Sequence, residues 1–293
     1  SIHLCQPAER VKDLTSVPSP YLTGMMDEFF DDKLMPVLTT NRGCPFSCAF
    51  CSEGTKYYNK VNSLNVERIE AEVEYIGQKL DRNKQQVGRS DAYITDSNFG
   101  MLKDDIYTAE ALAETKRKYG WPEYIQASTG KNSKERVLKV AEILQGGLRL
   151  SGSVQTLDPE VQANIKRSNI SNDALLEVAE TAGEVGANTY SEVILCLPGD
   201  SLKAHFFSLE QVVNAKYDFV LPRQLVMLAD TAIATKEWRE KYEMKTQYRV
   251  LTKSYGNYDY ANGYTLPAFE VDEVCVGGKN MTFADYLRAR DLS

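Results

Sequence analysis

Short apolar runs alternate with amphipathic stretches along most of this chain. Runs rich in β-branched and other apolar residues lie at 35–40, 92–95, 124–127, 148–151, 192–195 and 219–221. The stretches between them, at 66–80, 105–119, 135–144, 173–185 and 202–215, carry apolar residues at helical spacing. The pattern predicts six strands that alternate with five helices, in units of about 30 residues.

Strands that alternate with helices in this way are typical of repeated βαβ units, which build a parallel sheet. Right-handed crossovers either coil such a sheet toward a barrel or wind helices onto both of its faces. Both arrangements place ligands at the carboxyl ends of the strands. We therefore expect an α/β fold whose functional site lies where the strands end.

The two ends of the chain depart from this pattern. Residues 1–34 contain Pro7, Pro18 and Pro20 and predict an extended N-terminal linker. Residues 35–228 hold the alternating core, and residues 229–293 form a C-terminal extension. This extension predicts a charged helix at 235–244 and then a capping segment with half-buried tyrosines. Those tyrosines are Tyr248, Tyr255, Tyr258, Tyr260 and Tyr264.

Composition excludes several classes of protein. The 293 residues are 43% hydrophobic and 26% charged, which is typical of globular domains and not of disordered, collagenous or coiled-coil chains. No apolar run approaches the roughly 18 residues of a spanning helix and no signal peptide is recognisable, so we expect no membrane segment and a cytoplasmic location. A net charge of −7 disfavours nucleic acid as a partner.

The six cysteines are too dilute for a disulfide scaffold, yet Cys44, Cys48 and Cys51 fall within eight positions directly after the first predicted strand. A disulfide among them would leave one cysteine over, and a catalytic thiol needs only one. Structural zinc is the main alternative, but it normally takes four ligands, and no second pair follows at the usual spacing. Three thiolates on one loop favour an iron–sulfur cluster with an open coordination position. An open position implies a co-substrate.

The motif Cys-x-x-x-Cys-x-Phe-Cys at residues 44–51 resembles the defining motif of the radical S-adenosylmethionine superfamily, over about residues 35 to 228. The resemblance implies a partial six-stranded parallel β/α barrel of the TIM type. It also implies a [4Fe–4S] cluster on the three cysteines, with S-adenosylmethionine on the open iron. Such enzymes cleave S-adenosylmethionine reductively to methionine and a 5'-deoxyadenosyl radical, which abstracts hydrogen from a substrate. A flavodoxin- or ferredoxin-type protein supplies the electron.

The resemblance further implies which residues contact S-adenosylmethionine. Polar residues after the second strand suit its amino group, those after the fourth suit the ribose and carboxylate, and apolar residues of the fifth suit the adenine. Each has a plainer alternative, such as a local turn, a solvated face or core packing. The predicted contacts are Phe50, Asp96, Asn98, Ser151, Ser153, Gln155, Lys166, Arg167, Ile194 and Leu197. Cys196 and Cys275 are expected to be small buried residues.

Residues 18–24 and 40–45 resemble the cobalamin-binding branch of the superfamily, in which a cobalamin domain precedes such a linker. No Asp-x-His-x-x-Gly segment lies before residue 35, so we expect an excerpt, a processed form or a shortened relative. Three hypotheses follow: a cobalamin-associated radical methyltransferase; a cobalamin-free radical enzyme that performs epimerisation, rearrangement or oxidation; and a non-catalytic, metal-stabilised binding module. The substrate of either enzyme would be a small molecule or a peptide.

Overall fold

The computed structural model describes residues 8–31, 33–84, 89–130, 132–167, 179–184 and 186–292. The chain divides into two compact units, each assembled from several segments. The first unit comprises Ser1–Gly43, Lys60–Arg149 and Val185–Ala187, and the second comprises Cys44–Asn59, Leu150–Glu184 and Asn188–Ser293. Each unit contains a three-stranded parallel sheet.

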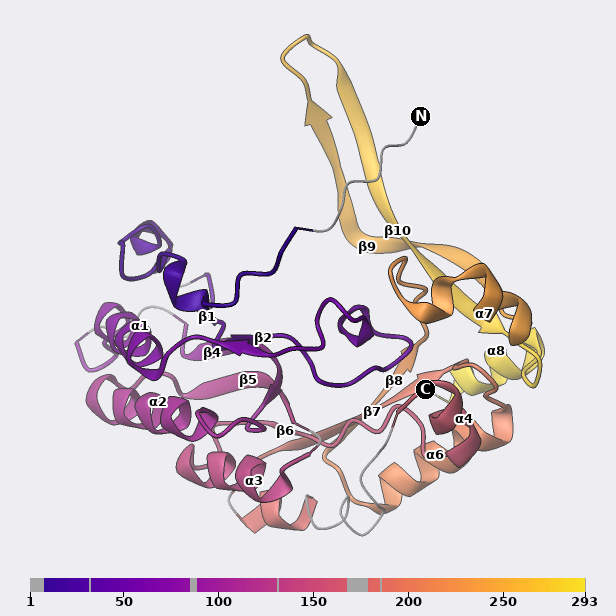
Figure 1. Ribbon diagram of the computed structural model, residues 1–293, viewed down its shortest axis with the longest axis horizontal. Helices are drawn as coiled ribbons and strands as arrows, with labels where there is room; N and C mark the ends of the chain where they lie inside the picture. The colour runs from indigo at the N-terminus through magenta and orange to yellow at the C-terminus, as the bar shows by residue number, and fades with distance from the viewer. Residues whose placement is uncertain are drawn as a thin grey trace. The chain divides into compact units, whose positions relative to one another are not determined.

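The sheet of the first unit has the order β1-β4-β5, formed by Val37–Leu38, Asp91–Phe99 and Tyr124–Thr129. Helices α1 (Val66–Lys79), α2 (Asp105–Tyr119) and α3 (Lys134–Ile143) follow one another along it (Figure 1). The amphipathic pattern accounts for this packing, since α1 buries Ile69, Val73 and Ile76 on one face. A short antiparallel pair, β2 (Asn41–Arg42) and β3 (Asn62–Ser63), flanks the cysteine segment.

The sheet of the second unit has the order β6-β7-β8, formed by Leu150–Ser151, Thr189–Leu195 and Phe219–Gln224. Burial alternates along β7, so that Ser191 and Val193 are buried while Glu192 and Ile194 lie on a half-exposed face. Helix α6 (Leu202–Asn214) packs against β7 and β8. This unit also contains the helices α4 (Pro159–Asn164), α7 (Lys236–Lys241) and α8 (Phe283–Asp291).

The predicted α/β fold with six parallel strands is confirmed, although the strands are hydrogen-bonded as two sheets of three. The predicted helices at 66–80, 105–119, 135–144 and 202–215 are present within one or two residues. Much of the predicted helix at 173–185 lies outside the described residues. The part that is described, residues 179–184, is helical. Short helices α4 and α8 were not predicted.

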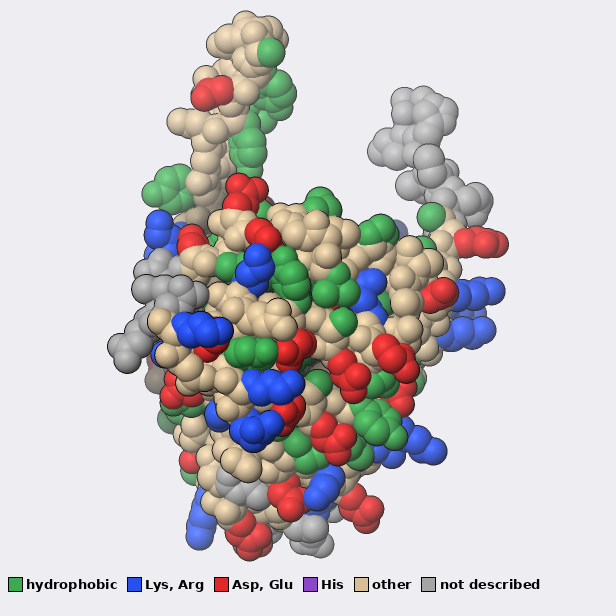
Figure 2. Space-filling model, turned by 90° about the vertical axis from the view of Figure 1, so that its left-hand side faces the viewer, with side chains coloured by type: hydrophobic (Ala, Val, Ile, Leu, Met, Phe, Trp, Pro, Cys, Tyr) green, Lys and Arg blue, Asp and Glu red, His purple; other side chains and the backbone are tan. Residues whose placement is uncertain are grey.

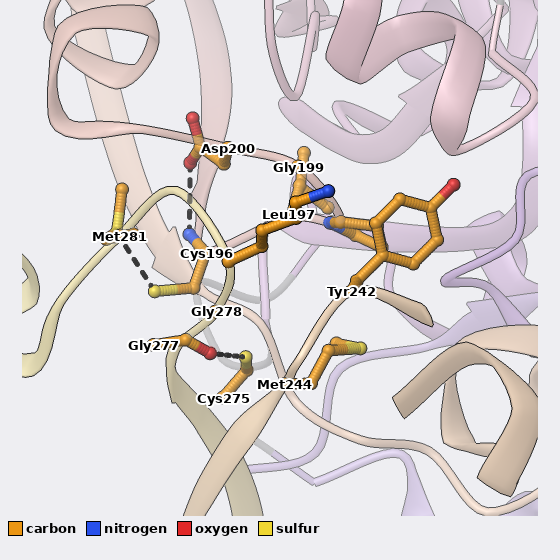
Figure 3. Close-up of a pocket in the computed structure, with 12 residues that line it drawn as sticks. Cys196, Leu197, Gly199, Asp200, Tyr242, Met244, Cys275, Gly277, Gly278 and Met281 are labelled. Atoms are coloured by element: carbon orange, nitrogen blue, oxygen red, sulfur yellow. Dashed lines mark hydrogen bonds between the residues drawn. The ribbon is translucent and has the colours of Figure 1, made fainter. Parts of the chain in front are cut away.

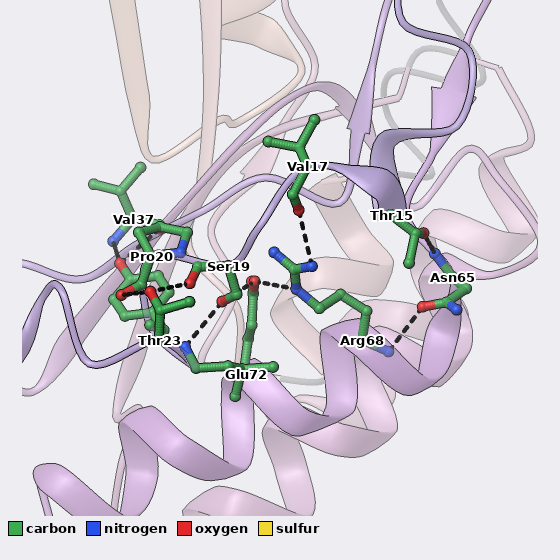
Figure 4. A network of polar contacts seen from close by, with 11 residues as sticks. Thr15, Val17, Ser19, Pro20, Thr23, Val37, Asn65, Arg68 and Glu72 are labelled. Carbon is green, nitrogen blue, oxygen red and sulfur yellow. Dashed lines mark hydrogen bonds and ion pairs between the residues drawn. The ribbon is translucent and has the colours of Figure 1, made fainter.

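Residues 1–7, with Pro7, lie outside the described residues, but residues 8–31 do not form the extended linker that Pro18 and Pro20 predicted. They contain two short 3₁₀ helices, Leu14–Ser16 and Asp27–Phe29, and are anchored on α1 (Figure 4). The Ser19 hydroxyl donates to Glu72 Oε1 at 2.6 Å, and Arg68 bridges the same carboxylate and the Val17 carbonyl. These buried contacts outweigh the extended preference of the prolines. The domain boundaries at residues 34 and 228 remain a prediction.

The tyrosine-rich segment forms a long antiparallel hairpin of β9 (Lys245–Asp259) and β10 (Thr265–Gly277). The expectation of half-buried tyrosines was wrong, because Tyr248 is 71% and Tyr255 79% exposed. The tyrosines are exposed because a two-stranded hairpin has no other layer packed on its two faces. Figure 2 shows hydrophobic side chains along this hairpin. Elsewhere, none of the helices in the described ranges has the length and apolar character needed to cross a membrane.

A buried carboxyl group in the first unit makes stability depend on pH. Burial raises the pKa of Asp105 from 3.8 to about 7, with the charge of Asp96 as a smaller cause. The folded state therefore holds a proton that the unfolded state has released, and stability falls as pH rises from about 4 to about 7. The full shift corresponds to about 4 kcal/mol at most.

We predict that Asp105→Asn, which keeps an acceptor for the Leu102 amide, loses less stability between pH 5 and pH 8 than the wild type. The expected difference is about 2 kcal/mol in urea unfolding free energy. Asp104→Asn is the matched control, since Asp104 is exposed next to it. Equal pH dependence of the wild type and Asp105→Asn would contradict the assignment.

Candidate metal centre

The three clustered cysteines lie on one loop of the second unit, between β2 and β3 in sequence. Cys48 is buried, Cys44 and Cys51 are half-buried, and none of the three forms a disulfide. Backbone hydrogen bonds fix the loop: the Cys44 amide donates to the Tyr58 carbonyl at 2.9 Å, and the Ala49 amide donates to the Ile165 carbonyl at 3.0 Å. The sulfurs are thus presented by a backbone that is held at several points.

A glycine closes this loop. A Cβ atom on Gly54 would lie 2.2 Å from the Cys48 carbonyl oxygen, far inside any permitted contact. The Gly54 amide donates to the Cys51 carbonyl at 2.9 Å, and the Cys51 amide to the Cys48 carbonyl at 3.2 Å. The backbone therefore passes so close to Cys48 that only glycine fits at position 54.

A buried guanidinium lies beside the cysteines. Arg167 Nη1 is 3.8 Å from Cys48 Sγ, Nε donates to the Val154 carbonyl at 3.2 Å, and Nη2 donates to the Ser153 carbonyl. Burial lowers the pKa of Arg167, and the neighbouring Cys48 counters part of that effect. The contact of Arg167 with the carboxylate of S-adenosylmethionine stays a prediction; in the structure its guanidinium is placed to hold the cysteine loop and to favour negatively charged sulfur.

The cysteine sulfurs are close enough to influence one another. Burial raises the pKa of Cys51, and Cys48 and Cys44 add to this increase. In the described ranges, no three Cys, His, Asp or Glu side chains already converge as a metal-binding group. The donor set nevertheless fits an iron–sulfur cluster, because three cysteine sulfurs on one anchored loop are soft ligands with a cation beside them.

A chain of polar side chains crosses the strands of the second unit. Ser151 and Ser153 share a hydrogen bond of 2.7 Å, Ser153 donates to Glu192 Oε2 at 3.2 Å, and Arg223 Nε donates to Glu192 Oε1 at 3.1 Å. The predicted serines are thus brought together. Glu192 was not singled out from the sequence. Its position two residues before Ile194 on β7 indicates that both side chains lie on the same face of the strand.

The side-chain oxygen of Gln155 is a buried hydrogen-bond acceptor without a donor among the described residues. The residue is buried with a left-handed backbone (φ 65°), and its Oε1 has no hydrogen-bond partner within the described residues. The backbone N–H of Gln155 donates to the Glu192 carbonyl at 2.8 Å, which fixes Gln155 beside β7. A buried acceptor without a partner costs about 1–3 kcal/mol, so a ligand that donates a hydroxyl would relieve it.

The apolar candidates Phe50, Ile194 and Leu197 share one hydrophobic cluster of the second unit with Ala49 of the cysteine loop. Leu197 is fully buried, while Phe50 and Ile194 are partly exposed. Lys166 does not join them, because it is exposed with its Nζ 5.9 Å from the Trp238 ring centroid. This contact agrees with the plainer interpretation of Lys166 as a solvated residue.

Asp96 and Asn98 belong to the first unit, where both are buried near the end of β4. The Asp96 carboxylate accepts from the Thr40 amide at 2.8 Å and from Asn41 Nδ2 at 2.7 Å, and the Thr40 hydroxyl donates to it as well. Thr40 and Asn41 were missed as its partners, since their contact spans more than 50 residues. Asp96 therefore ties β4 to the strand that leads into the cysteine loop.

Solved structures with a similar fold are radical S-adenosylmethionine enzymes. The methyltransferase TsrM from Kitasatospora setae aligns with 78% of this chain and 43% of its own, at 12% identity and a TM-score of 0.61. Coproporphyrinogen III oxidase from Escherichia coli aligns with 76% of this chain and 51% of its own, at 16% identity and a TM-score of 0.52. At such identities the likeness concerns the fold alone.

Two curated proteins are similar to this chain in sequence, and both are methyltransferases. The 2-(S-pantetheinyl)-carbapenam-3-carboxylate methyltransferase of Streptantibioticus cattleyicolor is 29% identical over 251 residues, which is 82% of this chain and 36% of the relative. The cobalamin-dependent radical SAM methyltransferase TokK of Streptomyces tokunonensis is 28% identical over 249 residues, with 82% and 35% covered. The chain thus spans about a third of their length. The model of the radical SAM superfamily matches residues 38–205, and the chain belongs to this superfamily.

Proposed function

We propose that this chain is the catalytic core of a radical S-adenosylmethionine enzyme, with a [4Fe–4S] cluster on Cys44, Cys48 and Cys51. The observation that carries the proposal is the anchored loop that holds three cysteines, with the Arg167 guanidinium 3.8 Å from Cys48 Sγ. When bound, the cluster and S-adenosylmethionine supply reductive cleavage of the sulfonium and a 5'-deoxyadenosyl radical. The protein's share of the work is binding, orientation and exclusion of water.

The second unit offers suitable groups for S-adenosylmethionine. Gln155 Oε1 can accept a hydrogen bond from a ribose hydroxyl, and the Ser151–Ser153–Glu192 chain supplies further polar groups on the neighbouring strands. Ile194 and Leu197, with Phe50 in the same cluster, provide an apolar wall for a flat base. Asp96 and Asn98 stay proposed for the amino group, although the Asp96 carboxylate already accepts from Thr40 and Asn41.

We further propose that the full reaction is a cobalamin-dependent radical methylation of a small molecule or peptide. Support comes from the two curated relatives, which are methyltransferases, one of them named as cobalamin-dependent. A low-potential reductant of the flavodoxin or ferredoxin type would supply the electron. The alternative is a cobalamin-free hydrogen abstraction on the same core.

We predict that the anaerobically reconstituted chain forms 5'-deoxyadenosine and methionine from S-adenosylmethionine under dithionite. Cys44→Ala, Cys48→Ala and Cys51→Ala should each lose cluster absorbance and this cleavage. Ser47→Ala, an exposed position on the same loop, is the control that should keep both. An iron-containing protein that never cleaves S-adenosylmethionine would instead support a non-catalytic module.

Gly54→Ala should disrupt the cluster loop without removing any thiol. Its new Cβ would collide with the Cys48 carbonyl, so the loop must shift, at a cost of about 1–3 kcal/mol in unfolding free energy. We expect a several-fold drop in iron and sulfide per chain after reconstitution. Gly256→Ala, where a Cβ meets no atom within 4 Å, should leave both quantities unchanged. Equal iron content in Gly54→Ala would refute the steric argument.

The cobalamin proposal predicts a second product. Transfer of a methyl group from S-adenosylmethionine leaves S-adenosylhomocysteine, which should accumulate only when hydroxocobalamin is added to the reduced, reconstituted protein. Mass spectrometry can follow S-adenosylhomocysteine and 5'-deoxyadenosine together. Formation of 5'-deoxyadenosine alone, unaffected by cobalamin, would favour the cobalamin-free enzyme.

A further inference from the structure

A small pocket, about the size of one water molecule, lies beside the turn after β7 in the second unit (Figure 3). Four chain segments line it: the turn after β7, the link between α7 and β9, the end of β10 and the turn before α8. The first, third and fourth of these carry sulfur-containing side chains that are buried. They contribute the buried side chains of Cys196, Cys275 and Met281, which are 4%, 1% and 2% exposed. None of these three residues belongs to the cysteine loop discussed above.

The Cys196 sulfur lies within hydrogen-bonding reach of the other two sulfur atoms. The Cys196 thiol donates to Met281 Sδ at 3.1 Å, and the Cys196 and Cys275 thiols lie within hydrogen-bonding reach of each other. Cys275 also donates to the Gly277 carbonyl at 3.3 Å, and both cysteines are free thiols. Two thiols and a thioether from distant parts of the sequence therefore converge beside this small pocket.

The backbone around these sulfurs is held in an unusual conformation. Cys196 has a φ of 66°, a left-handed backbone geometry that is strained for a residue other than glycine. Asp200 stabilises it, because the Cys196 amide donates to Asp200 Oδ2 at 3.1 Å. Ordinary apolar packing would not require a strained cysteine at this position, whereas a ligand site commonly contains such residues.

We propose that Cys196, Cys275 and Met281 form a binding site for a soft monovalent metal ion, Cu(I) in biological settings. Thiolate and thioether sulfur select soft metals, and a thioether is not among the usual ligands of zinc. Binding would release the two thiol protons and give a site with one net negative charge, which Lys279 at the pocket can balance. No change of oxidation state is involved.

The metal would lie between the three sulfur atoms, whose residues line this small pocket. Metal–sulfur bonds of roughly 2.3 Å in a trigonal site place the sulfurs about 4 Å apart. The Cys196–Met281 separation of 3.1 Å must therefore widen by under an ångström. Met has three flexible torsions and adapts readily, so this widening needs no movement of the strands. A bound metal would connect the turn after β7 to β10 and α8.

The test is a competition for Cu(I) between the anaerobically reconstituted protein and bicinchoninate, whose coloured Cu(I) complex reports transfer. We expect the wild type to withdraw one equivalent of Cu(I), also when Cys44, Cys48 and Cys51 are all replaced by alanine. Cys196→Ser and Cys275→Ser should weaken binding about 100-fold, and Met281→Leu about 10-fold. X-ray absorption at the copper edge should show three sulfur neighbours.

Met227→Leu is the matched control, since Met227 is buried in the same core but does not line the pocket. It should bind Cu(I) as the wild type does. Met281→Leu keeps the core volume and decides the matter if a cysteine variant fails to fold. The proposal is overturned if the wild type withdraws no Cu(I) or if all variants bind Cu(I) equally.

Discussion

The buried guanidinium of Arg167 is the contact on which the candidate site depends. A buried cation is costly unless its donors are satisfied, and here two carbonyls and the Cys48 sulfur accept from it. The same contacts connect the cysteine loop to the segment that follows β6. Three thiolates near one another would repel, and a fixed positive charge beside Cys48 offsets part of that repulsion.

The segment at residues 151–155 consequently has two tasks. Its carbonyl groups, at Ser153 and Val154, hold Arg167 against the cysteines. Its side chains, at Ser151, Ser153 and Gln155, present polar atoms beside β7. The groups proposed for the cluster and those proposed for S-adenosylmethionine therefore share one short piece of backbone, and a change there would disturb both.

A second carboxylate shows how local chemistry and tertiary structure diverge. Asp96 ends a predicted strand, where a ligand acceptor was expected, yet Thr40 and Asn41 already donate to both of its oxygens. Asp105, the first residue of α2, is buried, and this burial raises its pKa to about 7. Neither environment could be inferred from the neighbouring residues, because the donors and the burial come from segments distant in sequence.

The sequence by itself determined the six strands, most of the helices, the cysteine loop and the family, because hydrophobic periodicity and motif spacing are local properties. Only the tertiary structure decided that Arg167 turns to Cys48, that Lys166 lies over Trp238, and that Cys196 meets Cys275 and Met281. Each of these contacts joins segments far apart in the chain. Which of two adjacent basic residues is buried, or which thiols meet, depends on the packing of whole elements and leaves no periodic trace in the sequence.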